Sequence, residues 1–229
     1  MVSRMSSLRV PLTSVLLAAL TLSACSGGGG GGSLPAGTDL LKQSSTAMSS
    51  VSSVGFSIRT LGQPAIVIKS ADGKLLKSGD AQGTAQVTQF GFTLEIAFTL
   101  LGDTLYFKGL TGGYTKQPKS MITHYFNPSA ILDPSRGISG LLAKASAPKT
   151  DKKDSVSGVD AYEVSATLPQ SAASILVPNV KQDLQGQVWI AVKDHRLLKV
   201  KMDLTGATKG SVIASFTDFN GNFKITAPA

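Results

Sequence analysis

The chain has 229 residues, of which 42% are hydrophobic and 16% are charged, and its formal net charge is +8. This apolar fraction is large enough to bury a core and excludes wholesale disorder, while the length suits one domain or two small ones. A single Cys excludes an internal disulfide. Two His and 6% aromatic residues leave little material for a His-rich metal site or an aromatic platform that binds nucleic acid.

The first 24 residues have the pattern of a signal peptide. Arg4 and Arg9 precede an almost uncharged apolar stretch over residues 10–22, and the small residues Ser23 and Ala24 follow it. The stretch holds 13 residues, whereas a helix needs about 20 to cross the hydrocarbon core of a bilayer. We therefore expect residues 1–24 to direct export and not to remain as a transmembrane anchor.

The only cysteine, Cys25, follows this signal directly. The sequence Leu-Ser-Ala-Cys over residues 22–25 resembles a bacterial lipobox, at which diacylglycerol is attached to the Cys and the signal is cut just before it. A buried structural Cys is the alternative, but the apolar run before Cys25 and the polar segment after it favour lipidation. Cleavage would leave 205 residues and remove two Arg and no acid, so that the net charge falls to +6. The predicted location is the extracytoplasmic (periplasmic) face of the cell membrane, which the protein reaches through an N-terminal lipid anchor.

Residues 25–36 form a predicted tether, because they include six consecutive glycines, Gly27 to Gly32. A phosphate-binding loop is not expected, since no strand precedes these glycines and no Gly-Lys-Ser/Thr follows them. Residues 37–229 then form one domain, because neither an internal repeat nor a shift in composition divides them.

The first predicted helix of this domain covers residues 38–51, with Thr38 or Asp39 as its N-cap. Its apolar residues recur close to helical spacing: Leu40, Leu41, Ala47, Met48 and Val51. Its many Ser and Thr residues make it a poor isolated helix, so it is expected to pack against something larger.

From Val54 onward the apolar period changes to two, which predicts half-buried antiparallel strands. In the clearest run five side chains share one face: Phe92, Leu94, Ile96, Phe98 and Leu100. Two later runs alternate in the same way, with apolar faces of Val188, Ile190 and Val192, and of Leu198, Val200, Met202 and Leu204. Hairpin turns are expected at Asp72-Gly73, Gly102-Asp103, Gly112-Gly113, Ser157-Gly158 and Asn220-Gly221.

Two segments interrupt the strand pattern. Residues 127–145 predict a short helix followed by a second helix that begins near Pro134. Residues 169–176 predict another short helix, in which Ala172, Ala173, Ile175 and Leu176 are apolar. Many antiparallel strands with a few short helices indicate an α+β fold.

The sequence contains no recognisable catalytic or metal-binding motif. His124 and His195 are far apart, and Glu95 and Glu163, the only glutamates, occupy strand positions at which a solvent-facing carboxylate is expected. No Gly-x-Ser-x-Gly, no His-Glu-x-x-His and no cysteine pair occurs. We therefore expect no enzymatic activity, no metal and no cofactor; a hydrolase would require His124 to lie beside a Ser in a cleft.

Four lysines cluster between residues 144 and 153: Lys144, Lys149, Lys152 and Lys153. We favour a solvated loop for this cluster, and attraction to anionic lipid headgroups is the alternative. Nucleic acid is not expected as a partner, because the basic residues are not interleaved with aromatic residues and the signal directs the chain out of the cell.

The segment from Tyr125 to Ile138, YFNPSAILDPSRGI, resembles the Tyr-Asp-Pro-x-x-(Ile/Val)-Leu-(Asp/Asn)-Pro-x-x-Gly-(Leu/Ile) segment of the LppX/LprG/LprA/LprF lipoproteins of mycobacteria and relatives. Other features of that family follow in the expected order: the lipobox and polar tether, Leu105-Tyr106, Gly112-Gly113-Tyr114 and Val188-Trp189-Ile190. The resemblance covers essentially the whole chain after the signal.

The resemblance implies a strongly curved antiparallel sheet, a half-barrel, with helices over its concave face and an apolar cavity between them, similar to the lipoprotein carriers LolA and LolB. It further implies binding of lipids or glycolipids with two or three acyl chains and their movement between the inner membrane and the outer envelope. A membrane lipid transporter is then a candidate partner. The alternative is a structural or accessory envelope lipoprotein that acts through a protein partner and has no continuous cavity.

The apolar faces of the predicted strands and helices fit an ordinary core as well as the wall of a cavity, and the resemblance favours the cavity wall. Ala85 or Val87 is expected to face the cavity, where a small side chain leaves room for acyl chains. The complete expected lining is Ala85, Val87, Leu94, Ile96, Phe98, Leu100, Ile131, Leu132, Ile138, Leu141 and Leu142.

Overall fold

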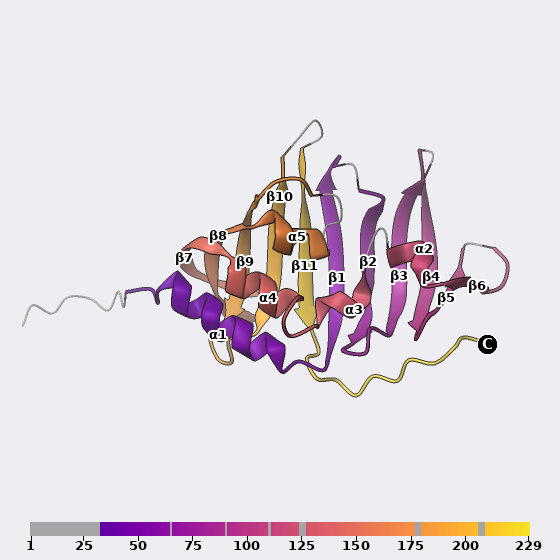
Figure 1. Ribbon diagram of the computed structural model, residues 1–229, viewed down its shortest axis with the longest axis horizontal. Helices are drawn as coiled ribbons and strands as arrows, with labels where there is room; N and C mark the ends of the chain where they lie inside the picture. The colour runs from indigo at the N-terminus through magenta and orange to yellow at the C-terminus, as the bar shows by residue number, and fades with distance from the viewer. Residues whose placement is uncertain are drawn as a thin grey trace, which may run out of the picture. The chain divides into compact units, whose positions relative to one another are not determined.

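The computed structural model describes residues 33–64, 66–89, 91–109, 111–123, 127–176, 180–205 and 209–229 (Figure 1). The predicted signal peptide, Cys25, most of the predicted tether and His124 lie outside these ranges, so that lipidation at Cys25 stays a prediction. Residues 34–229 form one compact unit that holds every described helix and strand.

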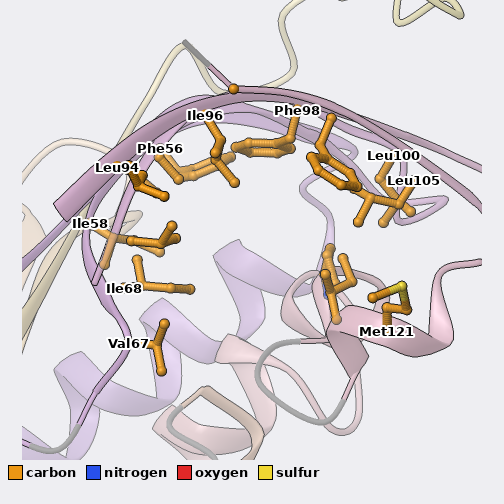
Figure 2. Close-up of a pocket in the computed structure, with 17 residues that line it drawn as sticks. Phe56, Ile58, Val67, Ile68, Leu94, Ile96, Phe98, Leu100, Leu105 and Met121 are labelled. Atoms are coloured by element: carbon orange, nitrogen blue, oxygen red, sulfur yellow. The ribbon is translucent and has the colours of Figure 1, made fainter. Parts of the chain in front are cut away.

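A single antiparallel sheet of eleven strands dominates this unit, in the order β6-β5-β4-β3-β2-β1-β11-β10-β9-β8-β7. The first six strands are β1 (Ser53–Gly62), β2 (Ile68–Leu76), β3 (Ala81–Gln89), β4 (Phe92–Leu101), β5 (Thr104–Lys108) and β6 (Thr115–Pro118). The other five are β7 (Ser146–Val156), β8 (Val159–Leu168), β9 (Leu184–Ala191), β10 (Leu197–Leu204) and β11 (Gly210–Thr217). Within the described residues β6 and β7 are free edges that do not pair with each other. The sheet is therefore curved but open, which confirms the expected half-barrel (Figure 2).

Five short or medium helices lie over one face of this sheet (Figure 1). They are α1 (Gly37–Ser49), α2 (Ser120–Thr123), α3 (Pro128–Ile131), α4 (Ile138–Lys144) and α5 (Gln170–Leu176). The α1 residue Met48 lies against β10, since its Sδ is 3.4 Å from the backbone nitrogen of Leu197. The α+β class predicted from the sequence is confirmed.

Two helix starts differ from the predicted ones. Helix α1 begins at Gly37 with Ala36 as its N-cap, because the Ala36 carbonyl accepts the amides of Asp39 and Leu40; Thr38 and Asp39 therefore lie inside the first turn. Helix α4 begins at Ile138 and not near Pro134, because residues 133–137 form a turn that Asp133 closes.

The Asp72-Gly73 pair, expected to be a turn, lies inside β2. Gly73 pairs with Phe56 of β1 and with Gly83 of β3, so here a glycine marks a close approach of strands and not the end of one. Three other predicted turns do separate successive strands: Gly102-Asp103, Gly112-Gly113 and Ser157-Gly158. Asn220-Gly221 follows the last strand and joins no hairpin.

Three of the four clustered lysines, Lys149, Lys152 and Lys153, lie in the edge strand β7 and not in the expected loop, and Lys144 ends α4. Lys149 lies 3.5 Å from Asp151, and Lys152 lies 3.4 Å from Glu163. Charged side chains on an exposed edge discourage further strand pairing, which is a structural use for these lysines.

The alternation predicted for residues 198–204 fails at its first position. A register shift between Leu197 and Lys199 turns Leu198 to the other face of the sheet, where it packs with Trp189 and Ala191. Leu197 takes its place in the main core.

Candidate functional site

The strands β1 to β5 present a continuous apolar surface towards the helices. Their registers align the inward-facing residues in rows that cross the sheet. One row is Phe56, Gly73, Gly83, Phe98 and Phe107, and the next is Ile58, Ala71, Ala85 and Ile96. Small residues therefore occupy the centre of each row, in β2 and β3, and large ones its flanks.

The two central glycines sit where the sheet leaves no room for a side chain. A Cβ on Gly83 would meet the carbonyl oxygen of Asp72 and lie 2.8 Å from the Cα of Gly73. A Cβ on Gly73 would lie 3.0 Å from the Cζ of Phe56, so the Phe56 ring covers this glycine. Glycines that allow close backbone approach and are covered by an aromatic ring are a common device for bending a sheet.

The bend encloses a cavity of about 490 Å³ between β1–β5 and the helices α2 and α3 (Figure 2). This volume is within the range of about 300–1,000 Å³ that is usual for sites that bind small ligands. The 17 lining residues among those described are all apolar. They are Phe56, Ile58, Val67, Ile68, Ala71, Ala85, Val87, Leu94, Ile96, Phe98, Leu100, Leu105, Phe107, Gly109, Met121, Ile122 and Pro128.

The same face of the sheet is filled over β8–β10. There six of the inward residues are 1% exposed or less: Val164, Leu168, Val188, Ile190, Val200 and Met202. Over β1–β5, by contrast, Phe56, Ile58, Ile96, Phe98 and Phe107 are only half-buried. We call these two regions the packed half and the hollow half. Since both present large apolar side chains, what distinguishes them is the empty space in front of the hollow half.

The cavity lining is buried in one place and exposed in others. Leu100 and Leu105, beside the β4–β5 turn, are 1% and 7% exposed. Val67, Leu94 and Met121 are 44%, 42% and 52% exposed although they line the cavity, so they mark its mouth.

The structure brings six of the predicted lining residues together around this cavity, and all six are strand residues: Ala85, Val87, Leu94, Ile96, Phe98 and Leu100. The five predicted helix residues do not line it: Ile131, Leu132, Ile138, Leu141 and Leu142. They are buried in the main core, whose buried residues also include several of β8–β10. They thus form the ordinary core that the sequence left open as the alternative.

Several lining residues were missed in the sequence, among them Phe56, Ile58, Phe107 and Met121. The alternation of Val54, Phe56 and Ile58 carried a signal for β1. The four-residue helix α2, which supplies Met121, is too short to have a periodic signal of its own.

Two carboxyl groups with a lowered pKa, those of Asp154 and Asp151, lie away from this lining. Asp154 accepts a hydrogen bond of 2.9 Å from the Trp189 indole on the opposite face of the sheet, and this bond holds the pKa of that carboxyl below its usual value. A hydrogen bond from Ser165 likewise lowers the pKa of Asp151 on β7. His195 lies in the β9–β10 turn with a φ of 57°.

Two kinds of feature are absent from the described residues. No group of three or more His, Cys, Asp or Glu side chains there is arranged to hold a metal ion. Among the helices of the described ranges, none is long and apolar enough to span a membrane.

Comparison with known proteins points to one family. The chain is 27% identical over 201 residues to the lipoarabinomannan carrier protein LprG of Mycolicibacterium smegmatis, and the aligned region covers 86% of this chain and 84% of that protein. The crystal structure of LprF from Mycobacterium bovis matches with a TM-score of 0.76 at 21% identity, over 84% of this chain and 97% of LprF. That of LppX from Mycobacterium tuberculosis matches with a TM-score of 0.63 at 22% identity, over 82% of this chain and 97% of LppX. The LppX_LprAFG lipoprotein family model matches residues 36–225, and the chain therefore belongs to this family.

Proposed function

We propose that the protein is an envelope lipoprotein that holds the acyl chains of a lipid or glycolipid in the cavity of the hollow half. It carries this ligand between the inner membrane and the outer envelope. The observation that supports the proposal most strongly is the cavity of about 490 Å³, whose described lining residues are all apolar. The name of the LprG relative, a lipoarabinomannan carrier, supports a glycolipid as one class of ligand.

The mechanism we propose is physical. Moving one CH₂ group from water into an apolar environment gains about 0.8 kcal/mol, so an acyl chain is strongly favoured inside the cavity. The polar headgroup stays at the mouth, beside Val67, Leu94 and Met121, where it keeps its contact with water. None of the described lining residues carries a nucleophile or a titratable side chain, which supports binding without chemical conversion.

A lipid anchor at the N-terminus is the second part of the proposal. Lipidation at Cys25 attaches the protein to the extracytoplasmic face of the cell membrane, and the glycines of residues 27–32 let the domain move above it. A membrane lipid transporter is the class of protein that we expect to supply or receive the ligand.

The proposal predicts that filling the cavity lowers lipid binding. In Val87→Trp a bulky ring replaces a half-buried lining residue of β3. The matched control is Gln86→Trp, which places the same ring at an exposed neighbouring position that does not line the cavity. Binding of a monomeric fluorescent fatty acid to residues 34–229 measures the effect.

We expect Val87→Trp to weaken binding at least about tenfold, since loss of the space for two or more CH₂ groups removes about 1.6 kcal/mol. Gln86→Trp should bind as the unmodified domain does. Equal affinities in both variants, or no binding by the unmodified domain, would contradict the proposed function.

A further inference from the structure

Exposed apolar side chains gather at the cavity mouth. Phe92, Val67, Leu94 and Met121 are 72%, 44%, 42% and 52% exposed. We call these four residues the apolar rim. Val67, Leu94 and Met121 also line the cavity, whereas Phe92 does not, so burial in the cavity wall does not account for Phe92.

Backbone pairing places three of the rim residues next to one another. The Thr88 amide donates a hydrogen bond of 2.8 Å to the Val67 carbonyl, and Thr88 pairs on its other side with Thr93. Phe92 and Leu94 flank Thr93 in β4 and share its inward-facing side with Ile96. Met121 lies across the cavity on α2 (Figure 2). The rim therefore borders the opening on both sides and continues the apolar lining outward.

The strands beside the mouth carry two lysines and one glutamate. Lys69 follows Ile68 in β2, Lys108 ends β5, and Glu95 follows Leu94 in β4. Within the described residues Lys69 and Lys108 form no ion pair. Further along β2, Asp72 is already paired with Arg59 at 2.9 Å.

An apolar rim with two unpaired lysines and one glutamate beside it fits a surface that is apolar within and anionic at its face. A bilayer with anionic lipids has this combination, and each Lys near such a surface attracts it appreciably. A soluble protein partner would need acidic groups opposite the lysines and an apolar insert shaped to the rim.

We propose that the apolar rim inserts into the surface of an anionic bilayer, with Phe92 as the leading side chain. The mouth then opens directly onto lipid, and an acyl chain enters the cavity without crossing water. This inference rests on the proposed function, because the rim matters for transfer only if the cavity holds acyl chains.

Vesicle binding by residues 34–229 tests the inference. The vesicles are phosphatidylcholine alone and an equal mixture of phosphatidylcholine and phosphatidylglycerol. Phe92→Ser should lower the partition of the domain onto the anionic vesicles by about tenfold, the loss expected from removing one inserted Phe. Val159→Ser is the control, because Val159 is 45% exposed but lies in β8 beside the β7–β8 turn.

A second pair of variants reports insertion directly. The only Trp of the chain, Trp189, is 6% exposed, so an added surface Trp dominates any change in emission. Phe92→Trp should retain binding and shift its emission to the blue on anionic vesicles, whereas Val159→Trp should not. Unchanged binding of Phe92→Ser, an equal loss in Val159→Ser, or equal affinity for both kinds of vesicle would overturn the inference.

Uptake of the monomeric fluorescent fatty acid separates this inference from the proposed function. Phe92→Ser should take up the monomer as the unmodified domain does, since Phe92 lies outside the lining. Monomer uptake by a domain that binds no vesicles would overturn docking alone, and vesicle binding by a domain that takes up no monomer would overturn the proposed function alone.

Discussion

At the scale of single residues, Asp133 organises the connection between α3 and α4. Its Oδ1 accepts the amides of Ser135 and Arg136, each at 2.9 Å, and its Oδ2 accepts the Arg136 guanidinium at 3.0 Å. Arg136 and then Ser135 are the main causes that hold the pKa of Asp133 well below its usual range. Asp133, which belongs to the segment that resembles the family, therefore forms a turn between α3 and α4. The sequence pattern alone does not predict this role.

This carboxylate predicts a particular dependence of stability on pH. Because its pKa is lower in the folded state, its contribution is complete above the unfolded value of about 4 and is lost as the pH falls below it. Asp133→Asn should therefore lower the urea midpoint at pH 7, and the difference from the unmodified domain should shrink below about pH 4. Arg136→Gln, which removes the largest cause, should show part of the same trend. A difference that stays constant down to low pH would rule out this role for Asp133.

At the scale of elements, periodicity located the strands with the clearest alternation, β4, β9 and β10, because a sheet with one apolar face requires alternation. Sequence patterns gave the wrong element where one residue pair fits two structures. Asp72-Gly73 is a favourable turn sequence, yet in the structure Gly73 lies inside β2, where it allows the close approach of the strand that contains Gly83. The β10 bulge at Leu198 and the charged edge strand β7 likewise depend on neighbours that are distant in the sequence.

The glycine pair predicts a large effect of adding one methyl group. Gly83→Ala should destabilise the domain by about 1–3 kcal/mol, the usual cost of forcing an atom into occupied space, because its Cβ meets the backbone of β2. Gly113→Ala is the control, since a Cβ at Gly113 has no atom within 4 Å. Chemical denaturation measures both variants. Similar unfolding free energies for the two would mean that the sheet does not need the close approach at Gly83.

At the scale of the whole described unit, one face of one sheet is used in two ways. The packed half is buried beneath helices, with Val188 and Ile190 at 1% and 0% exposure. The hollow half keeps Ile58 and Ile96 half-buried in front of empty space. Alternation predicted which strand residues face inward, and so found six that line the cavity. It could not predict where the space is filled, because that depends on where helices remote in sequence come to lie.

The division into a packed and a hollow half can be tested by following isoleucine methyl groups during lipid titration. NMR spectra of residues 34–229, labelled at the Ile δ1 methyls, would be recorded as a monomeric fatty acid is added. The proposed function predicts that the signals of Ile58, Ile68 and Ile96 shift and saturate together, while those of Ile138 and Ile190 stay in place. Shifts centred on Ile138 and Ile190, or no shift at Ile58 and Ile96, would contradict the claim that the cavity of the hollow half holds acyl chains.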